Sequence, residues 1–198
     1  MSSKDDSRAR LADEVRRYYD ENTARFERYG QGGASIHRAV WGPGVETREG
    51  AFRHVDGLVL GELRAFEGTP TVLDLGCGLG ATLMHLASTT QIRGEGITIS
   101  SMQAARASEL AGAAGLSGAV RFREGDFLAL PRDLADVHLA LSIEAFVHSQ
   151  DADRYFAEAA RVLRVGGRLI VCDDFLTPRG AAATSARDRR RIDEFRRG

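Results

Sequence analysis

The 198-residue sequence is poor in cysteine, proline, tryptophan and lysine, and it contains no long apolar run. Its two cysteines, Cys77 and Cys172, are too few for a disulfide framework, and both lie inside apolar segments. We therefore expect two buried thiols in a reducing compartment, and a cytoplasmic location. No apolar stretch is long enough for a membrane span, and the polar start of the chain is unlike a signal peptide. The five histidines show no metal-ligand spacing with cysteines or carboxylates, so no metal site is predicted.

An excess of charge of either sign is also lacking. Lys and Arg total 27 and Asp and Glu total 28, which gives a net charge of -1. Such a chain has no global positive field to gather nucleic acid or an anionic membrane, so neither is expected as a partner. A length of 198 residues, of which 43% are hydrophobic, predicts one globular domain with a sizeable core and room for a small appendage.

Two patterns divide the sequence near residue 69. Before it, helices are predicted over residues 8–29 and 47–66, and the glycine-rich residues 30–33 separate them. After it, short apolar strands alternate with amphipathic helices. The predicted strands are residues 71–75, 93–98, 119–123, 136–142 and 168–173, and the predicted helices are residues 81–88, 101–114, 151–163 and 185–197. This alternation indicates an α/β fold, a Rossmann-like doubly wound and mostly parallel sheet with helices on both faces.

The same pattern predicts where functional residues lie. Ligands of doubly wound sheets bind beyond the carboxyl ends of the strands, near the point where strand order reverses. We therefore search for chemistry directly after each predicted strand. We divide the chain into an N-terminal helical cap or lid (1–68), a ligand-binding core (69–178) and a C-terminal helix (179–198).

A glycine-rich turn follows the first of these strands. Asp74 lies just inside the strand, and Gly76, Gly78 and Gly80 follow at every second position. Glycine lets a backbone turn tightly and approach a ligand closely, and the next helix offers free N–H groups. The third glycine comes one residue too early for the dinucleotide fingerprint. A tight strand-to-helix connection without a ligand is the alternative interpretation.

The spacing Asp74-x-Gly76-x-Gly78-x-Gly80 resembles the first motif of the class I S-adenosylmethionine-dependent methyltransferases. That resemblance implies the class I methyltransferase fold, S-adenosyl-L-methionine as the cofactor and S-adenosyl-L-homocysteine as the product. It also implies that Asp74, Gly76, Cys77 and Gly78 lie against the methionine and ribose portions of the cofactor.

The second strand ends in Thr98-Ile99-Ser100, and Gln103 follows one turn into the next helix. Many family members have an acid at the Thr98 position. The threonine–glutamine variant resembles the branch that contains cyclopropane-fatty-acid synthases and related C-methyltransferases, and it implies that Thr98, Ile99 and Gln103 contact the cofactor. Glu95 is the second choice for the ribose. Thr98 and Ser100 are also good helix N-caps, and capping is compatible with binding.

The third strand leads to Asp126 and Phe127. In the resembling family an Asp at this place accepts a hydrogen bond from the adenine amino group, and the next apolar residue covers the ring. The alternative is a simple turn, because Asp after Gly favours turns.

The fourth strand ends in Ser142-Ile143-Glu144, which resembles the same place in sterol and geranyl-diphosphate C-methyltransferases. The resemblance implies that Ser142 lies beside the cofactor and that Glu144 is catalytic and faces the substrate. A carboxylate can stabilise a carbocation and take up the final proton. His148, four residues on, is a second catalytic candidate, as a base for O- or N-methylation. The alternatives are a surface carboxylate near a helix start and a histidine in a polar network.

The cap region carries aromatic residues that resemble the lid of the same C-methyltransferase branch. Tyr19 is implied to contact the cofactor, and Tyr29, His37 and Trp41 are implied to contact the substrate. Residues 30–33 could hinge such a lid and exclude water. A hydrophobic stripe that only docks the helix on the sheet is the alternative.

These motifs predict a methyltransferase for a small molecule of natural-product biosynthesis, without a nucleic-acid partner or a membrane span. The preferred chemistry is C-methylation of an isoprenoid or prenyl-bearing intermediate, with cyclisation as an open second step. The alternatives are an O- or N-methyltransferase of a phenol or amine, and a cofactor-binding fragment without turnover. Mg2+ is expected only if the substrate is a diphosphate.

The C-terminal part departs from the resembling family. The class I sheet has seven strands, whereas five are predicted here, so its C-terminal strands are expected to be missing and the helix over 185–197 to be cut short. An uncovered fifth strand is an association hazard, so we expect a homo-oligomer.

Overall fold

The structure is a computed structural model that describes residues 3–29, 37–175, 178 and 185–196. Its elements follow in the order α1 (Ser3–Tyr29), α2 (Arg48–Leu63), β1 (Thr71–Leu75), α3 (Ala81–Thr89), β2 (Arg93–Thr98), α4 (Ser101–Ala113), β3 (Val120–Glu124), β4 (Val137–Ile143), the short 3-10 helix η1 (Phe146–His148), α5 (Ala152–Val162), β5 (Leu163–Cys172) and α7 (Ala186–Arg196). The predicted alternation of strands and helices after residue 69 is confirmed.

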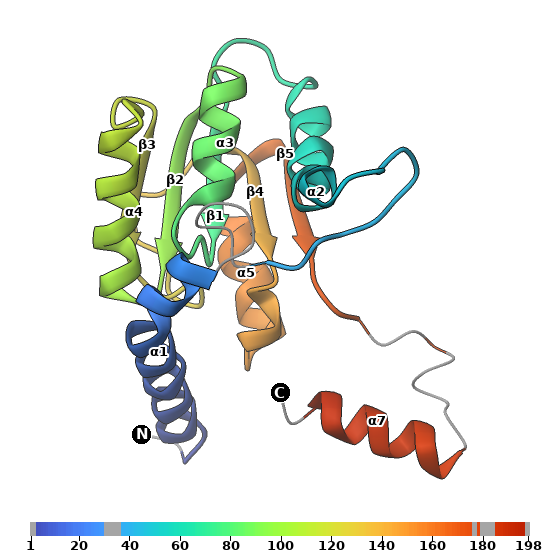
Figure 1. The fold of residues 1–198 in the computed structure, drawn as a ribbon. Coiled ribbons are helices and arrows are strands. Elements are labelled where there is room, and N and C mark those ends of the chain that lie inside the picture. Colours follow the sequence, from blue (N-terminus) through green and yellow to red (C-terminus); the bar gives the residue numbers. More distant parts are fainter. Residues whose placement is uncertain (1–2, 30–36, 176–177, 179–184, 197–198) are drawn as a thin grey trace.

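The strands form one sheet in the order β3-β2-β1-β4-β5, and every neighbouring pair is parallel (Figure 1). The chain moves outward from β1 to β3 and then crosses back to β4 on the other side of β1. Strand order therefore reverses at the carboxyl ends of β1 and β4, which is where ligands of such sheets bind.

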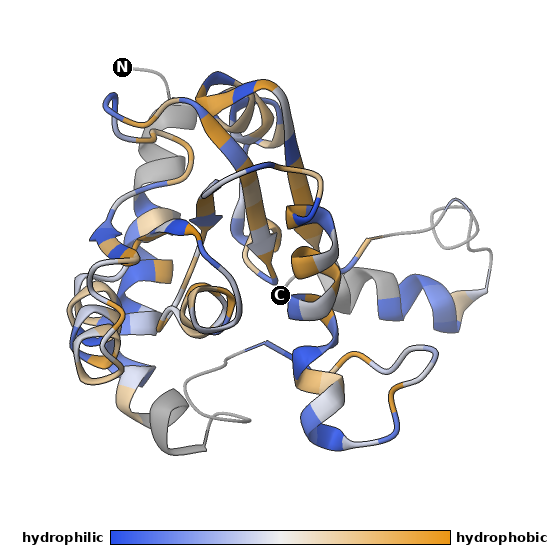
Figure 2. Cartoon of the chain, turned by 90° about the horizontal axis from the view of Figure 1, so that it is seen from above, coloured by the Kyte–Doolittle hydropathy of each residue, from blue (hydrophilic) through white to orange (hydrophobic). Residues whose placement is uncertain are grey.

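Both faces of the sheet are covered, as an all-parallel sheet requires. On one face, side chains of α2, α3 and α4 pack on alternate strand residues such as Val72 and Leu139. On the other face, α5 packs Tyr155, Ala159 and Val162 on the intervening residues, which include Leu73. Figure 2 shows the hydrophobic residues concentrated along the central strands and the hydrophilic ones on the outer helices.

Side-chain caps define where several helices begin. The hydroxyl of Thr47 accepts a hydrogen bond from the Gly50 amide at 3.0 Å, and that of Ser100 accepts from the Gln103 amide at 3.1 Å. Asp151 likewise accepts from the Arg154 amide at 3.0 Å. Each contact satisfies an N–H group that has no partner inside its own helix.

Among the strands, β5 differs most from its predicted bounds. It begins at Leu163, five residues before the predicted start and directly after α5. Leu163 pairs with Val137 and Arg168 pairs with Leu139, so the extra residues between them form an irregularity in the ladder. Gly166 has a φ of 78°, which allows this deviation.

The N-terminal helices occupy different places. α2 was grouped with the cap, but its Val59 and Leu63 belong to the core cluster on the sheet. α1 packs against α4 and extends away from the sheet, and α7 lies apart from it (Figure 1). None of the helices in the described ranges is long and apolar enough to cross a membrane.

Candidate cofactor and substrate site

A cavity of about 510 Å³ lies at the carboxyl ends of β1, β2 and β4, where strand order reverses. α1 and the segment that begins at His37 close it from the N-terminal side. Most of the predicted site residues line it: Tyr19, His37, Asp74, Gly76, Cys77, Gly78, Thr98, Ile99, Gln103, Asp126, Phe127, Glu144 and His148. Residues far apart in the sequence thus meet at the carboxyl ends of the strands, where ligands of doubly wound sheets bind.

The turn after β1 presents bare backbone to the cavity. Gly76 has a φ of 93°, and a Cβ added there would lie 2.3 Å from the Cβ of Ala145. The amides of Gly76 and Cys77 both donate to the carbonyl of Ile97, at 2.8 and 3.0 Å, so the turn is fixed to β2. Only glycine meets both requirements at position 76, because its left-handed backbone and its close neighbour each exclude a side chain.

Asp74 reaches the cavity from inside β1 and is nearly fully buried. Burial raises the pKa of its carboxyl to about 8, and the nearby charge of Asp56 on α2 adds to the effect. A buried carboxyl of this kind favours a hydrogen-bond donor or a positive charge as its neighbour.

A polar network joins β2, α4 and α1. The Thr98 hydroxyl donates to the side-chain oxygen of Gln103 at 2.8 Å, and the Ser100 hydroxyl donates to Asp20 of α1 at 2.5 Å. Arg16 of α1 donates to the carbonyl of Ile99 at 3.2 Å. Gln103 is 2% exposed, and its amide nitrogen has no hydrogen-bond partner among the described residues. The network therefore leaves one buried donor beside the cavity for a ligand.

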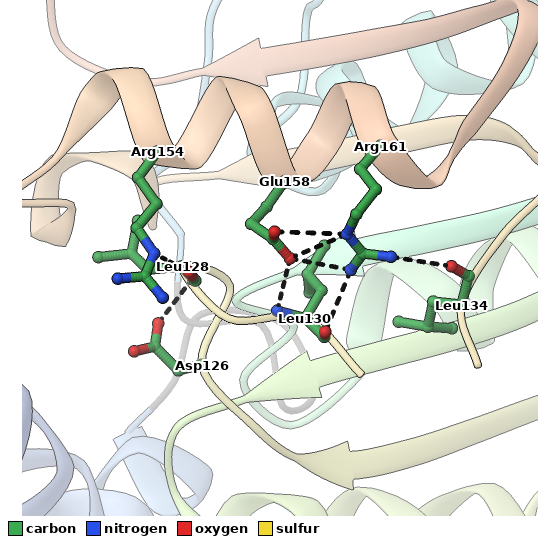
Figure 3. Close-up of polar contacts among 7 residues, drawn as sticks. All are labelled: Asp126, Leu128, Leu130, Leu134, Arg154, Glu158 and Arg161. Atoms are coloured by element: carbon green, nitrogen blue, oxygen red, sulfur yellow. Dashed lines mark hydrogen bonds and ion pairs between the residues drawn. The ribbon is translucent and has the colours of Figure 1, made fainter. Parts of the chain in front are cut away.

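The segment after β3 is held by α5 (Figure 3). A carboxylate oxygen of Asp126 accepts from the Leu128 amide at 2.7 Å, while Arg154 of α5 donates to the Leu128 carbonyl at 2.5 Å. The neighbouring ring of Phe127 packs edge-on against Tyr155, with centroids 5.4 Å apart. The turn interpretation of Asp126 is therefore confirmed, and both residues also line the cavity, so turn and ligand contact are compatible.

Glu144 follows β4 in a left-handed conformation, with a φ of 50°. Its Oε1 accepts from the amide of Arg38 at 3.0 Å and from the Nε of Arg38 at 3.1 Å. The same guanidinium donates to Asp174, after β5, at 2.7 Å. A strained backbone and a clamp from a distant segment thus fix this carboxylate at the cavity wall.

Tyr19 and His148 form a second polar pair at the cavity, with the hydroxyl oxygen 2.9 Å from Nε2. Burial raises the pKa of Tyr19 to about 12 and lowers the pKa of His148, although the carboxylate of Asp173 opposes the second shift. Near neutral pH the pair is therefore a protonated phenol and a neutral imidazole.

Two predicted site residues, Ser142 and Trp41, are not among the residues that line the cavity, and a third, Tyr29, has a side chain outside the described part of the chain. Ser142 is fully buried in β4. Trp41 is 60% exposed. Tyr29 ends α1, but its side chain lies outside what the structure describes. Glu95, the second choice for the ribose, forms ion pairs with Arg121 and Arg123 instead.

Comparison of the sequence with known proteins shows which family it resembles. Residues 72–167 match a family described as a methyltransferase domain. The 27-O-demethylrifamycin SV methyltransferase of Amycolatopsis mediterranei (strain S699) is 31% identical over 166 residues, which cover 84% of this chain and 60% of that protein. Residues 72–167 therefore belong to the methyltransferase domain family, and the chain is similar to class I S-adenosylmethionine-dependent methyltransferases.

The chain is also similar to a C-methyltransferase and to a cyclase. Cycloartenol-C-24-methyltransferase of Arabidopsis thaliana is 33% identical over 164 residues, which cover 83% of this chain and 48% of that protein. The crystal structure of the [4+2]-cyclase SpnF superimposes with a TM-score of 0.72 and 29% identity, and the match covers 80% of this chain and 59% of that one. The chain therefore spans about half to three fifths of the length of these relatives.

The walls around the glycine turn fit the cofactor of the methyltransferases on two observations. Gly76 and Gly78 line the cavity with positive φ and no side chain, which allows a ligand to approach closely, and the unpartnered nitrogen of Gln103 offers a buried hydrogen-bond donor. Asp74 and Asp126 add acceptors on either side. A nucleoside with an amino-acid tail has complementary donors and acceptors for each.

Arg38, Asp173 and Asp174 also line the cavity but were not predicted. The two acids directly follow β5, so a search after every strand would have found them. Arg38 carries no such signal, because its partners Glu144 and Asp174 lie 106 and 136 residues away in the sequence.

Proposed function

We propose that this protein transfers a methyl group from S-adenosyl-L-methionine to a carbon atom of an isoprenoid or prenyl-bearing small molecule. The observation that carries this proposal is the placement of Glu144, a clamped carboxylate at the cavity wall just beyond β4. The sequence similarity to a sterol C-24-methyltransferase supports the choice of a carbon acceptor.

The cofactor, when bound, supplies a methyl group on a positively charged sulfur, so the acceptor needs little further activation. The chain must align the acceptor and exclude water, because these effects supply much of the rate in such a transfer. The glycine turn, Thr98, Gln103 and Asp126 would hold the cofactor. α1 and the segment at His37 and Arg38 cover the cavity and would exclude solvent.

Glu144 has two tasks in this proposal. An alkene that accepts a methyl cation becomes a carbocation, and the carboxylate stabilises that charge. The same carboxylate then takes up the proton that leaves the carbon next to the cation, which restores a double bond. Attack of a second double bond on the cation would instead form a ring and move the positive charge to another carbon, and loss of a proton from the neighbouring carbon to Glu144 would then restore a double bond.

The pair of Tyr19 and His148 supports a second candidate function. A neutral imidazole beside the cavity can accept a proton from a phenol or an amine, which would suit O- or N-methylation. The similarity to an O-methyltransferase of the rifamycin type supports this alternative.

Two variants separate the candidates. Glu144→Gln keeps the shape of the side chain and should bind S-adenosyl-L-homocysteine normally, yet lose about 10²–10⁴-fold in turnover on a prenyl acceptor. His148→Gln should leave that turnover largely intact. Methyl transfer from radiolabelled cofactor to prenyl, phenol and amine acceptors measures both. Full turnover by the Glu144 variant, together with loss of turnover in the His148 variant, would favour the second candidate. Cofactor binding by the wild-type protein without transfer to any acceptor would indicate a binding fragment.

A further inference from the structure

The substrate end of the cavity carries more negative than positive charge. Glu144, Asp173 and Asp174 line it beyond β4 and β5, and Arg38 is the cation among them. Arg38 already donates to Glu144 at 3.1 Å and to Asp174 at 2.7 Å. Its positive charge is therefore paired with two of the three carboxylates.

The other basic groups of the cavity do not offset this charge. Arg154 also lines the cavity, lies beside Asp126 and donates to the Leu128 carbonyl (Figure 3). Burial lowers the pKa of His148, so its ring is neutral near neutral pH. Among the described residues, an anionic group next to Glu144 would therefore meet three carboxylates and a guanidinium, that of Arg38, which is already paired with two of them.

A divalent cation could in principle bridge these carboxylates to an anionic substrate, but the side chains are not arranged for it. Among the described residues, no three His, Cys, Asp or Glu side chains are grouped as metal ligands. Oxygens of Glu144 and Asp174 converge on the guanidinium of Arg38 instead. Both oxygens of Asp173 accept amide hydrogen bonds, from Val147 at 2.9 Å and from Asp174 at 2.8 Å.

Apolar side chains at the same end favour an apolar substrate body. Val147 and Tyr18 line the cavity and are 51% and 54% exposed. Next to Val147, the ring of Phe146 stacks on exposed Phe175, with centroids 6.2 Å apart. A cavity of about 510 Å³ has room for the cofactor and the reacting end of a substrate, so the apolar body would lie on these residues.

We propose that the cavity selects an apolar substrate whose part near Glu144 is uncharged or positively charged, and that it rejects prenyl diphosphates. This inference rests on the proposed function for the identity of the site, and it narrows the substrate class. Selection by repulsion can be strong, because one unpaired charge of the wrong sign in a substrate changes its affinity markedly.

Three probes with the same prenyl chain test the inference: geranylamine, geraniol and geranyl diphosphate. Each is titrated calorimetrically into the protein, with and without S-adenosyl-L-homocysteine, at low and at physiological salt. We expect geranylamine to bind about tenfold more tightly than geraniol at low salt, with the ratio falling as salt increases. We expect no binding of geranyl diphosphate, with or without Mg2+.

Matched variants assign the selectivity to the named charges. Asp174→Asn should reduce the ratio of amine to alcohol affinity several-fold, and Arg38→Gln should increase it. Glu109→Gln removes the same charge from the exposed surface of α4, where Glu109 pairs with Arg106, and should leave the ratio unchanged. Geraniol affinity serves as the check that each variant is folded.

Binding of geranyl diphosphate as tight as that of geraniol, in the presence or absence of Mg2+, would overturn the inference. So would failure of geranylamine to bind, or an equal effect of the Glu109 variant. Amine selectivity in a protein that does not bind S-adenosyl-L-homocysteine would uphold the inference and overturn the proposed function.

Discussion

Arg38 holds one oxygen of Glu144 with two donors, its own amide at 3.0 Å and its Nε at 3.1 Å. The guanidinium side chain is largely exposed, and exposed ion pairs add only about 0–1 kcal/mol to stability. The contact therefore matters for the orientation of the carboxylate more than for folding. It also links the cap segment to the end of β4.

Gly76→Ala should destabilise the protein and abolish cofactor binding. The new methyl group would lie 2.3 Å from the Cβ of Ala145, and alanine at a φ of 93° is strained. Together these effects should lower the free energy of unfolding by about 2–4 kcal/mol. Urea denaturation and titration with S-adenosyl-L-homocysteine measure the two losses.

Gly61→Ala is the matched control for that variant. Gly61 lies on α2, and nothing is within 4 Å of an added Cβ. The substitution should raise the free energy of unfolding by about 0.5–1 kcal/mol, because alanine is the better helix former. Equal destabilisation by both substitutions would contradict the role given to the turn.

Asp74→Asn should remove a pH dependence of stability. The carboxyl of Asp74 has a pKa of about 8 in the folded protein and an ordinary value of 3.8. The folded state therefore holds a proton that the unfolded chain releases in this range, so the contribution to stability is complete below about pH 4 and is lost as the pH rises through 8. Thermal unfolding from pH 4 to pH 9 should show this loss in the wild type and a flatter profile in the variant. The variant should also bind the cofactor more weakly, and identical profiles would refute the assignment.

His148→Gln should change the pH dependence with the opposite sign. Burial lowers the pKa of His148 in the folded protein below its ordinary value of 6.5. The unfolded chain then binds the proton first, so stability falls as the pH drops below about 6.5. That fall should be smaller in the variant. NMR titration of the His148 ring should give a pKa below 6.5, and an apparent value above it would contradict the buried pair with Tyr19.

Gln103→Leu should weaken cofactor binding while leaving the fold intact. The side chain is buried, and its unpartnered nitrogen is the donor that the cavity offers to a ligand. Loss of one buried hydrogen bond should reduce affinity for S-adenosyl-L-homocysteine about tenfold. Gln91→Leu, at an exposed site outside the cavity, is the control, and equal affinities of the two variants would remove Gln103 from the site.

The sequence predicted the sheet better than the details of the site. β1 and β2 begin and end at the predicted residues, and the apolar run of β1 lies between Pro70 and Gly76, because such patterns act locally. The early start of β5 could not be predicted, since it depends on pairing with Val137 across an irregular ladder. The expectation that ligands bind beyond the carboxyl ends of the strands pointed to Asp74, Thr98, Asp126 and Glu144. These residues line one cavity because the strand ends meet at one edge of the sheet.

The remaining site features depend on distant contacts. Ser142 lies one residue before the strand end, where alternation turns it into the interior rather than the cavity. Trp41 belongs to the irregular segment before α2, where no periodicity indicates which way a side chain points. The contact of Arg38 with Glu144 joins residues 106 apart, and no local pattern carries that information.

Calorimetric titration of S-adenosyl-L-homocysteine into the wild-type protein, with NADH as the parallel ligand, tests the central claim most directly. The geometry of the glycine turn predicts saturable binding of one S-adenosyl-L-homocysteine per chain and no heat from NADH. Tight NADH binding without any response to S-adenosyl-L-homocysteine would contradict it.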